Sequence, residues 1–285
     1  MPTHEYDFIG QGTLQDAGYE QACRAADDHS VSLVSGNDLI GSATLVSIGN
    51  ICGLLTADHV WQFLRRGDAK DHFCMLVSRH LHRFEYPFEE CHPIVIGNYS
   101  LDHEEEGPDL TFIWLNNPLK LGIIKSRKSF YPLNASKGRI FDKIPYDRSL
   151  WLVWGAPGEK SSKSFQDTGE PILKVTHFAG GGQFIGKVER GGFDYVRIKI
   201  ASGTKNYPSS YGGVSGGGIW IPFRYSEDPE GRNLKTETSI VLSGVAYFQT
   251  EEEPNYKTIV LHGPKSIYER VIDKVHKEAG VCEAG

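Results

Sequence analysis

The chain has 285 residues, of which 39% are hydrophobic and 23% charged, a balance typical of a globular protein that buries a core. The formal net charge is -6 and no basic stripe stands out, which argues against a nucleic-acid partner. No apolar run approaches the roughly 18 residues of a membrane span, and no charged-then-apolar leader opens the chain, so we expect no membrane partner.

The cysteines indicate the redox environment. They are scattered and odd in number, so they do not suggest a complete disulfide framework. We interpret them as reduced thiols of a cytoplasmic protein. The five are Cys23, Cys52, Cys74, Cys91 and Cys282.

In chain order, residues 1–30 carry a weak helical pattern and are expected to form an N-terminal extension. From Ser30 onward, short runs rich in Val, Ile, Leu, Phe and Tyr alternate with Gly, Pro, Asn and Asp. Twelve such runs predict an all-β barrel or sandwich. They are 31–34, 43–48, 52–56, 73–77, 94–96, 110–115, 150–154, 172–177, 195–200, 218–221, 240–248 and 258–261.

Helical patterns are scarce in the rest of the chain. One short helix is expected directly after His59, and a second over 265–277, where apolar residues fall on one face. The stretch 116–149 has little strand pattern and is expected to connect two halves. Loops are expected at 101–108, 155–171, 202–213 and 224–238.

Ser215 lies in the glycine-rich stretch 212–218. A serine hydroxyl is a poor nucleophile that needs a base and a pocket for the oxyanion. Glycines on both sides allow a sharp turn that points successive N–H groups into one pocket. The alternative is a glycine-rich hairpin with an incidental serine, because such loops are common.

His59 and Asp109 are the matching base and acid. His59 stands where an apolar strand ends and a helix begins, and imidazole is the natural base near neutral pH. Asp109 opens an apolar strand, where a buried carboxylate would fix the histidine tautomer. Taken singly, each has an ordinary structural explanation, as a strand-end histidine or a Pro-Asp turn. The chain order His, Asp, Ser is that of chymotrypsin.

These motifs resemble those of the trypsin-like, or chymotrypsin-fold, serine proteases. Residues 54–60 (LLTADHV) are similar to the histidine block of that family, 109–113 (DLTFI) to its aspartate strand, and 213–217 (GVSGG) to its serine loop. Residues 41–46 and 242–245 resemble two of its strands. The resemblance covers roughly residues 31–275 and is confined to these motifs.

The resemblance implies two six-stranded antiparallel β-barrels with the active site in the cleft between them and a short C-terminal helix. We expect residues 31–140 to form the first barrel and 141–285 the second barrel with the helix. The resemblance also implies a serine endopeptidase with His59, Asp109 and Ser215 as catalytic triad. Such an enzyme would act without metal or cofactor on a protein or peptide substrate. The N–H groups of Gly213 and Ser215 would form the oxyanion hole. The sequence neither identifies nor excludes an activating protein partner.

Alignment on the family places Ser209 at the base of the pocket for the residue before the cut. It places Tyr247, Phe248 and Gln249 on the wall of that pocket. Neutral groups at these positions predict a preference for uncharged residues at the cleaved bond. A loop shift within 202–213 would spoil this alignment.

Two departures from the family bear on mechanism. Val214 replaces the aspartate that, in secreted members, pairs with a new N-terminus after cleavage, so we expect activity without such cleavage. Asp58 replaces an alanine and is expected to face solvent. The acidic stretch 102–106 is likewise expected to be a solvated surface.

Parts of the sequence are also compatible with two other functions and a metal site. A protease-like module without catalysis would bind a peptide as an added strand, although all three triad residues are present. A serine esterase would pair Ser215 with Asp228 and His262, but the strand–helix alternation of that fold is missing. A zinc site among His72, Cys74, His80, His82, Cys91 and His92 matches no finger spacing.

Overall fold

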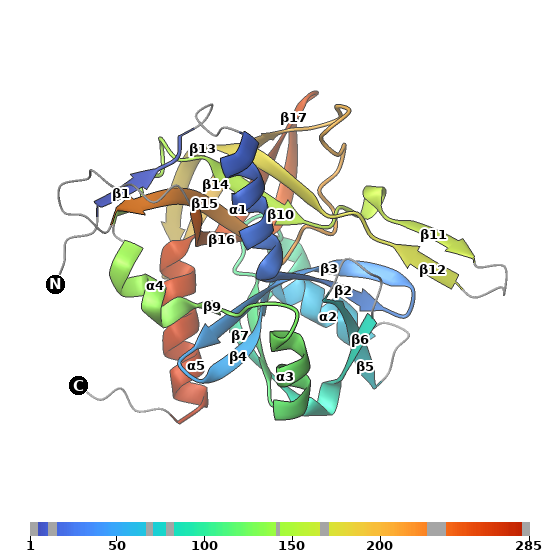
Figure 1. The fold of residues 1–285 in the computed structure, drawn as a ribbon. Coiled ribbons are helices and arrows are strands. Elements are labelled where there is room, and N and C mark those ends of the chain that lie inside the picture. Colours follow the sequence, from blue (N-terminus) through green and yellow to red (C-terminus); the bar gives the residue numbers. More distant parts are fainter. Residues whose placement is uncertain are drawn as a thin grey trace.

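Each half of the chain forms one antiparallel β-sheet, and the two sheets lie one above the other in Figure 1. We describe the fold from a computed structural model. It describes residues 5–10, 16–66, 71–77, 83–140, 143–165, 171–226 and 238–280.

The sheet of the N-terminal half is strongly curled. Its order is β6-β5-β2-β3-β4-β8-β7, and the two-residue strand β9 (Tyr131–Pro132) pairs in parallel with β3. In the described part of the chain, the end strands β6 and β7 do not pair with each other. The strands are β2 (Ser30–Ser35), β3 (Asp38–Ile48), β4 (Ile51–Thr56), β5 (His72–Leu76), β6 (Arg83–Pro87), β7 (Cys91–Gly97) and β8 (Leu110–Leu115).

The C-terminal half forms a closed barrel. Six strands follow one another in the order β15-β10-β13-β14-β17-β16, and pairing of β15 with β16 closes the ring. Strand β1 (Glu5–Phe8) pairs with β15, and the hairpin β11 (Ser162–Phe165) and β12 (Pro171–Lys174) projects from the body. The barrel strands are β10 (Trp151–Gly155), β13 (Phe178–Arg190), β14 (Phe193–Ala201), β15 (Gly218–Ser226), β16 (Ser239–Glu253) and β17 (Tyr256–His262).

Helices lie around the two sheets (Figure 1). The expected C-terminal helix is present as a π-helical turn (Ser266–Val271) followed by α5 (Ile272–Glu278), with Ile267, Val271 and Val275 buried on one face. The expected helix after His59 is α2, and the described residues of the stretch 116–149 include the helices α3 and α4. The α-helices not yet bounded are α1 (Asp16–Asp28), α2 (Asp58–Arg66), α3 (Pro118–Lys125) and α4 (Leu133–Ile140); short 3-10 turns are Phe88–Glu90, Leu101–His103 and Gly158–Lys160.

The expected all-β fold with a short C-terminal helix is confirmed. One detail differs: the C-terminal half closes as a six-stranded barrel, whereas the N-terminal half is a curled sheet. The two halves share apolar clusters, and in one of them Tyr195 and Tyr247 of the barrel pack with Leu54 and Ile113 of the curled sheet. This shared cluster holds the facing edges of the two sheets together, and the candidate site lies there.

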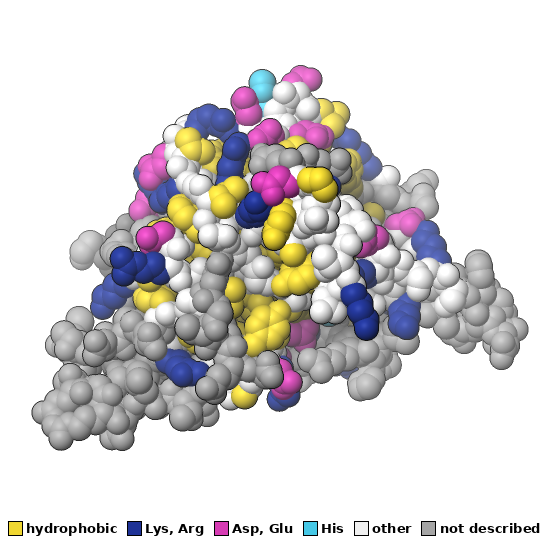
Figure 2. Space-filling view, turned by 90° about the horizontal axis from the view of Figure 1, so that it is seen from above, with side chains coloured by type: hydrophobic (Ala, Val, Ile, Leu, Met, Phe, Trp, Pro, Cys, Tyr) yellow, Lys and Arg dark blue, Asp and Glu magenta, His cyan; other side chains and the backbone are white. Residues whose placement is uncertain are grey.

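The surface carries both signs of charge. Figure 2 shows Lys and Arg interspersed with Asp and Glu around a central group of hydrophobic side chains on that face. Within the described ranges, none of the helices combines the length and apolar character needed to cross a membrane.

Candidate active site

Strand pairing brings His59 and Asp109 together, although 50 residues separate them. Thr56 at the end of β4 pairs with Thr111 of β8, so the residues just beyond these positions meet at one edge. His59 donates twice to Asp109, from its backbone N to Oδ1 at 2.9 Å and from Nδ1 to Oδ2 at 2.5 Å. Asp109 is 1% exposed, so its carboxylate is shielded from water.

This pairing selects the tautomer of the neutral imidazole. An ionised carboxylate only accepts hydrogen bonds, so Nδ1 of His59 carries the proton and Nε2 is left as an acceptor. The rings of Phe63 and Tyr99 flank the imidazole, with centroids 5.8 Å and 5.3 Å away. The arrangement suits a general base that takes a proton at Nε2.

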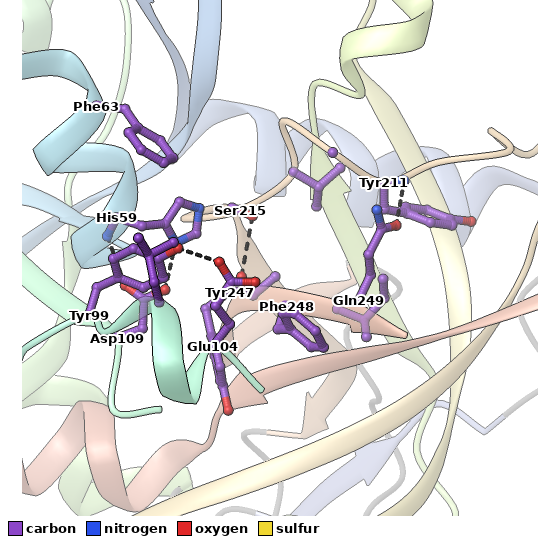
Figure 3. Close-up of a pocket in the computed structure, with 15 residues that line it drawn as sticks. His59, Phe63, Tyr99, Glu104, Asp109, Tyr211, Ser215, Tyr247, Phe248 and Gln249 are labelled. Carbon is purple, nitrogen blue, oxygen red and sulfur yellow. Dashed lines mark hydrogen bonds and ion pairs between the residues drawn. The ribbon is translucent and has the colours of Figure 1, made fainter. Parts of the chain in front are cut away.

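Ser215 lies on the loop that leads into β15, and Figure 3 shows His59 between Asp109 and Ser215. Ser215 Oγ donates to the carbonyl of Tyr247 at 3.5 Å, the long limit of a hydrogen bond, and makes no hydrogen bond to His59. Catalytic hydrogen bonds are often long in proteins without substrate. The hydroxyl is therefore weakly held beside the base.

The carbonyls of Gly212 and Val214 fix the orientation of the two backbone N–H groups that follow them in the Ser215 loop. The carbonyl of Gly212 accepts from Gly158 N at 2.6 Å, and that of Val214 accepts from Gly217 N at 2.8 Å. Both peptide bonds are trans, so the N–H groups of Gly213 and Ser215 point the opposite way from these carbonyls. Neither N–H makes a hydrogen bond among the described residues, so both are available to an oxyanion.

Position 213 requires glycine because of its backbone conformation and its close contacts. Its φ is +90°, in the region that favours glycine, and a Cβ there would lie 2.5 Å from the carbonyl oxygen of Ala156. The next residue, Val214, is 1% exposed and packs in the apolar core of the barrel. Packing of Val214 therefore holds the loop where a charged pair would do so in secreted proteases of the trypsin type.

A cavity of about 390 Å³ joins these groups, and its wall includes His59, Asp109 and Ser215. The other lining residues are Phe63, Tyr99, Leu101, Glu104, Tyr211, Gly212, Val214, Ala246, Tyr247, Phe248, Gln249 and Ile259. Three of the four expected pocket residues, Tyr247, Phe248 and Gln249, line this cavity.

Ser209 does not line the cavity. It is exposed, and its N–H donates to Glu159 Oε1 at 2.7 Å. Tyr211 and Gln249 occupy that end of the cavity instead, with the N–H of Tyr211 donating to Gln249 Oε1 at 2.8 Å. Gln249 Nε2 donates to Ser210 Oγ at 3.1 Å, so the amide side chain is fixed at both ends.

Asp58 is a supporting residue that the sequence did not reveal. We expected it at the surface, but it is 2% exposed. Its carboxylate accepts from Thr111 Oγ1 at 2.6 Å, from Tyr99 N at 3.0 Å and from Gln62 Nε2 at 2.7 Å. Asp58 thereby connects α2, which carries His59, to β8 and to the loop that carries Tyr99.

Glu104 departs from the expected solvated surface in a similar way. It is half-buried, lines the cavity, and accepts a hydrogen bond from the Tyr99 hydroxyl at 2.5 Å. Burial, followed by this contact with Glu104, raises the pKa of Tyr99. The phenol therefore stays neutral and acts as a donor.

His262 turns toward Asp109 rather than toward Ser215. Its Nε2 accepts from the backbone N of Asp109 at 3.1 Å, in a fully buried position. The esterase pairing is therefore not formed by His262, and Asp228 lies outside the described residues.

A group with metal-ligand chemistry lies on the β5–β6 hairpin. The ligand atoms of His72, Cys74 and Glu85 lie within 4.8 Å of one another. Cys74 packs with Val34 and Leu173 in a small apolar cluster. Of the other weighed ligands, His80 and His82 lie outside the described residues. The described cysteines Cys23, Cys52, Cys74 and Cys91 are free thiols.

Comparison with solved structures identifies the fold. The Drosophila Grass clip serine protease of the Toll pathway is similar with a TM-score of 0.50 and 13% identity, over 98% of this chain and 76% of that one. The HtrA-type protease AlgW with tripeptide gives 0.49 and 15%, over 92% of this chain and 64% of the AlgW chain. The serine protease domain of the Sesbania mosaic virus polyprotein gives 0.39 and 13%, over 89% and 92%.

No protein-family model and no curated protein matches the sequence. The likeness to the Grass protease shows the fold alone, because the identity is low. The chain therefore has the trypsin/chymotrypsin type of fold, and its chemistry has to be argued from its own residues.

Proposed function

We propose that this chain is a serine endopeptidase that hydrolyses peptide bonds in a protein or peptide through an acyl-enzyme. The supporting observation is the doubly hydrogen-bonded pair of His59 and buried Asp109 at a cavity that also holds Ser215. In this proposal Ser215 is the nucleophile, His59 the general base and Asp109 the group that orients His59.

The proposed reaction uses groups of the chain itself. A peptide binds in extended form, His59 Nε2 takes the proton of Ser215 Oγ, and the hydroxyl attacks the carbonyl carbon. The N–H groups of Gly213 and Ser215 bind the oxyanion. His59 then protonates the leaving amine, and water hydrolyses the acyl-enzyme by the same route.

The cavity supports an uncharged preference at the cleaved bond. Tyr211, Phe248 and Gln249 offer rings and an amide beside Ser215 but no charge. The fixed amide of Gln249 narrows this end of the cavity. We propose cleavage after small to medium or aromatic uncharged residues, and Ser209 has no part in it.

We also propose that activity needs no cleavage of the chain. The buried, apolar Val214 holds the Ser215 loop without an ion pair. We propose the cytoplasm as its compartment, because the described cysteines are free thiols.

A fluorophosphonate probe and a peptide library test the proposal. The probe should label Ser215 in a protein whose N-terminus mass spectrometry finds intact, and the library should be cleaved after uncharged residues. Ser215→Ala and His59→Ala should abolish labelling and leave rates only about 10³–10⁴-fold above water. Labelling of another serine would contradict the assignment. Peptide binding without labelling would favour the catalytically silent binding module.

A further inference from the structure

One wall of the cavity carries a long apolar surface that ends in a carboxylate. We name it the His59-side lobe, formed by Phe63, Tyr99, Leu101 and Glu104. Phe63 is 42% exposed and Leu101 is 73% exposed, so both offer apolar surface to an incoming chain. At the end of this surface, the Tyr99 hydroxyl holds the Glu104 carboxylate by a hydrogen bond.

Glu104 differs from Glu105 and Glu106, which follow it in the acidic loop, in having no basic partner among the described residues. Its neighbour Glu105 pairs with Arg197 at 2.7 Å, and Glu106 lies 3.5 Å from His103. In the described part of the chain, Glu104 has a neutral phenol as its partner and no cation. The other carboxylate of the cavity, Asp109, is already bound to His59. The cavity therefore has one half-buried negative charge free to meet a positive one.

We infer that Glu104 is a specificity-determining residue that selects substrates with a Lys or Arg side chain next to the cleaved residue. This inference rests on the proposed peptidase function. Lys and Arg combine a long apolar stem with a charged head. The stem matches Phe63, Leu101 and the Tyr99 ring, and the head reaches a carboxylate for a charge-assisted hydrogen bond.

The position follows from the two sides of the cavity. Figure 3 shows Phe63 and Tyr99 on one side of Ser215, and Tyr211 and Gln249 on the other. Successive side chains of an extended peptide point to opposite sides. When the uncharged residue at the cleaved bond enters the Tyr211 side, its neighbour enters the His59-side lobe. The hydroxyl of Tyr247 donates to Glu105 O at 2.9 Å and docks this loop against β16, the strand that also carries the cavity residues Phe248 and Gln249.

Three matched peptides test the inference. They share an uncharged residue at the cleaved bond and differ only in the residue before it, which is Lys, Gln or Glu. The wild type should cleave the Lys peptide with kcat/KM roughly tenfold above the Gln peptide, and the Glu peptide least well. The preference should shrink as salt is raised, because screening weakens a charge pair that is partly open to solvent.

The variant Glu104→Gln removes the charge but keeps an oxygen that accepts from Tyr99. It should bring the Lys-to-Gln ratio close to one, and Glu104→Lys should reverse the order of the Lys and Glu peptides. Glu105→Gln is the matched control, because Glu105 pairs with Arg197 outside the cavity. It should keep the wild-type ratio.

The outcomes separate the two proposals. Equal cleavage of the three peptides, or a Lys preference that survives in Glu104→Gln, overturns the role of Glu104 and leaves the peptidase standing. Neither cleavage nor fluorophosphonate labelling overturns the peptidase, and the inference with it. If the probe labels Ser215 but no peptide is cleaved, competition decides: the Lys peptide must slow labelling at a lower concentration than the Gln peptide.

Discussion

His262 is a buried base placed directly behind the candidate site. Its Nε2 accepts from the backbone N of Asp109, and the rings of Tyr195 and Tyr247 pack on it with centroids 5.3 Å and 4.7 Å away. Among the described residues, its Nδ1 has no hydrogen-bond partner. Burial lowers the pKa of His262 from 6.5 to about 4, against the opposing pull of Asp109 and Asp194. The imidazole is therefore neutral at pH 7.

This burial predicts a loss of stability in mild acid. Below pH 6.5 the unfolded chain protonates His262, whereas the folded protein does so only near pH 4. The unfolded state thus binds more protons, so the free energy of unfolding decreases as the pH is lowered through this window, by about 2 kcal/mol at pH 5 relative to pH 7. Urea unfolding at pH 7 and pH 5 measures the fall. It should be smaller in His262→Gln, which keeps an acceptor for Asp109.

His103→Gln serves as the control for this measurement, because the His103 side chain is exposed. Its pH dependence should follow that of the wild type. Parallel curves for the wild type and His262→Gln would show that the acid sensitivity arises elsewhere.

At this scale the sequence predicted the residues whose motifs are local. His59, Asp109 and Ser215 each stand in a short, recognisable stretch, and the first two are hydrogen-bonded as expected. The roles of Asp58 and His262 depend on partners 41 and 153 residues away, at Tyr99 N and Asp109 N. Such contacts leave no local pattern, so the sequence could not show that these two side chains are buried.

At the scale of elements, the structure contains a glycine-rich strand that the sequence pattern did not indicate. Strand β13 was not predicted, because its first half contains Gly180, Gly181 and Gly182, which lower strand propensity. The barrel requires glycine there: a Cβ on Gly180 would lie 2.2 Å from the ring of Phe178, and one on Gly181 2.9 Å from Leu150. Close packing against neighbouring side chains selected glycine over β-branched residues, and periodicity does not reveal such packing.

Helix α1 packs against both sheets, although the sequence showed only a weak helical pattern there. It contacts β2 of the curled sheet and β10, β15 and β16 of the barrel. Ala22 and Ala26, one helical turn apart, are 1% and 0% exposed. Small side chains allow this close approach, but they gave only a weak apolar pattern in the sequence.

Ala26→Leu should therefore destabilise the protein. Added methylenes have no room at a fully buried position, and such overpacking costs about 1–3 kcal/mol. Ala17→Leu is the matched control, since Ala17 is an exposed residue of the same helix and should change stability by about 0.5 kcal/mol or less. Thermal unfolding of both variants measures the difference. Equal stability of the two would show that α1 packs loosely.

At the scale of the whole molecule, the candidate site is divided between the two halves. His59 and Asp109 lie in the half with the curled sheet and Ser215 lies in the half with the barrel, so the relative position of the two halves sets the distance between base and nucleophile. Ser42 of β3 joins them. Its N–H donates to Ser215 O at 2.9 Å, its hydroxyl donates to Gly213 O at 2.9 Å, and the same hydroxyl accepts from Ala156 N at 3.2 Å.

Ser42→Ala should slow catalysis while leaving the fold in place. The variant keeps the backbone bond to Ser215 but leaves Gly213 O and Ala156 N unpaired in a buried site, at about 1–3 kcal/mol of stability. The stretch of loop between the Gly213 and Ser215 N–H groups then loses one of its anchors. Because complete loss of one oxyanion donor costs about 10²–10³-fold, a misplaced donor should lower kcat by roughly tenfold or more, with little change in KM.

Ser47→Ala on the same strand is the control, since Ser47 pairs with Cys52 and Pro132 away from the Ser215 loop. It should keep the wild-type kcat and the wild-type rate of fluorophosphonate labelling. A wild-type kcat in Ser42→Ala would mean that Val214 packing alone holds the loop. A fall in KM together with kcat would instead indicate that Ser42 strains the bound substrate, because relief of ground-state strain tightens binding as it slows turnover.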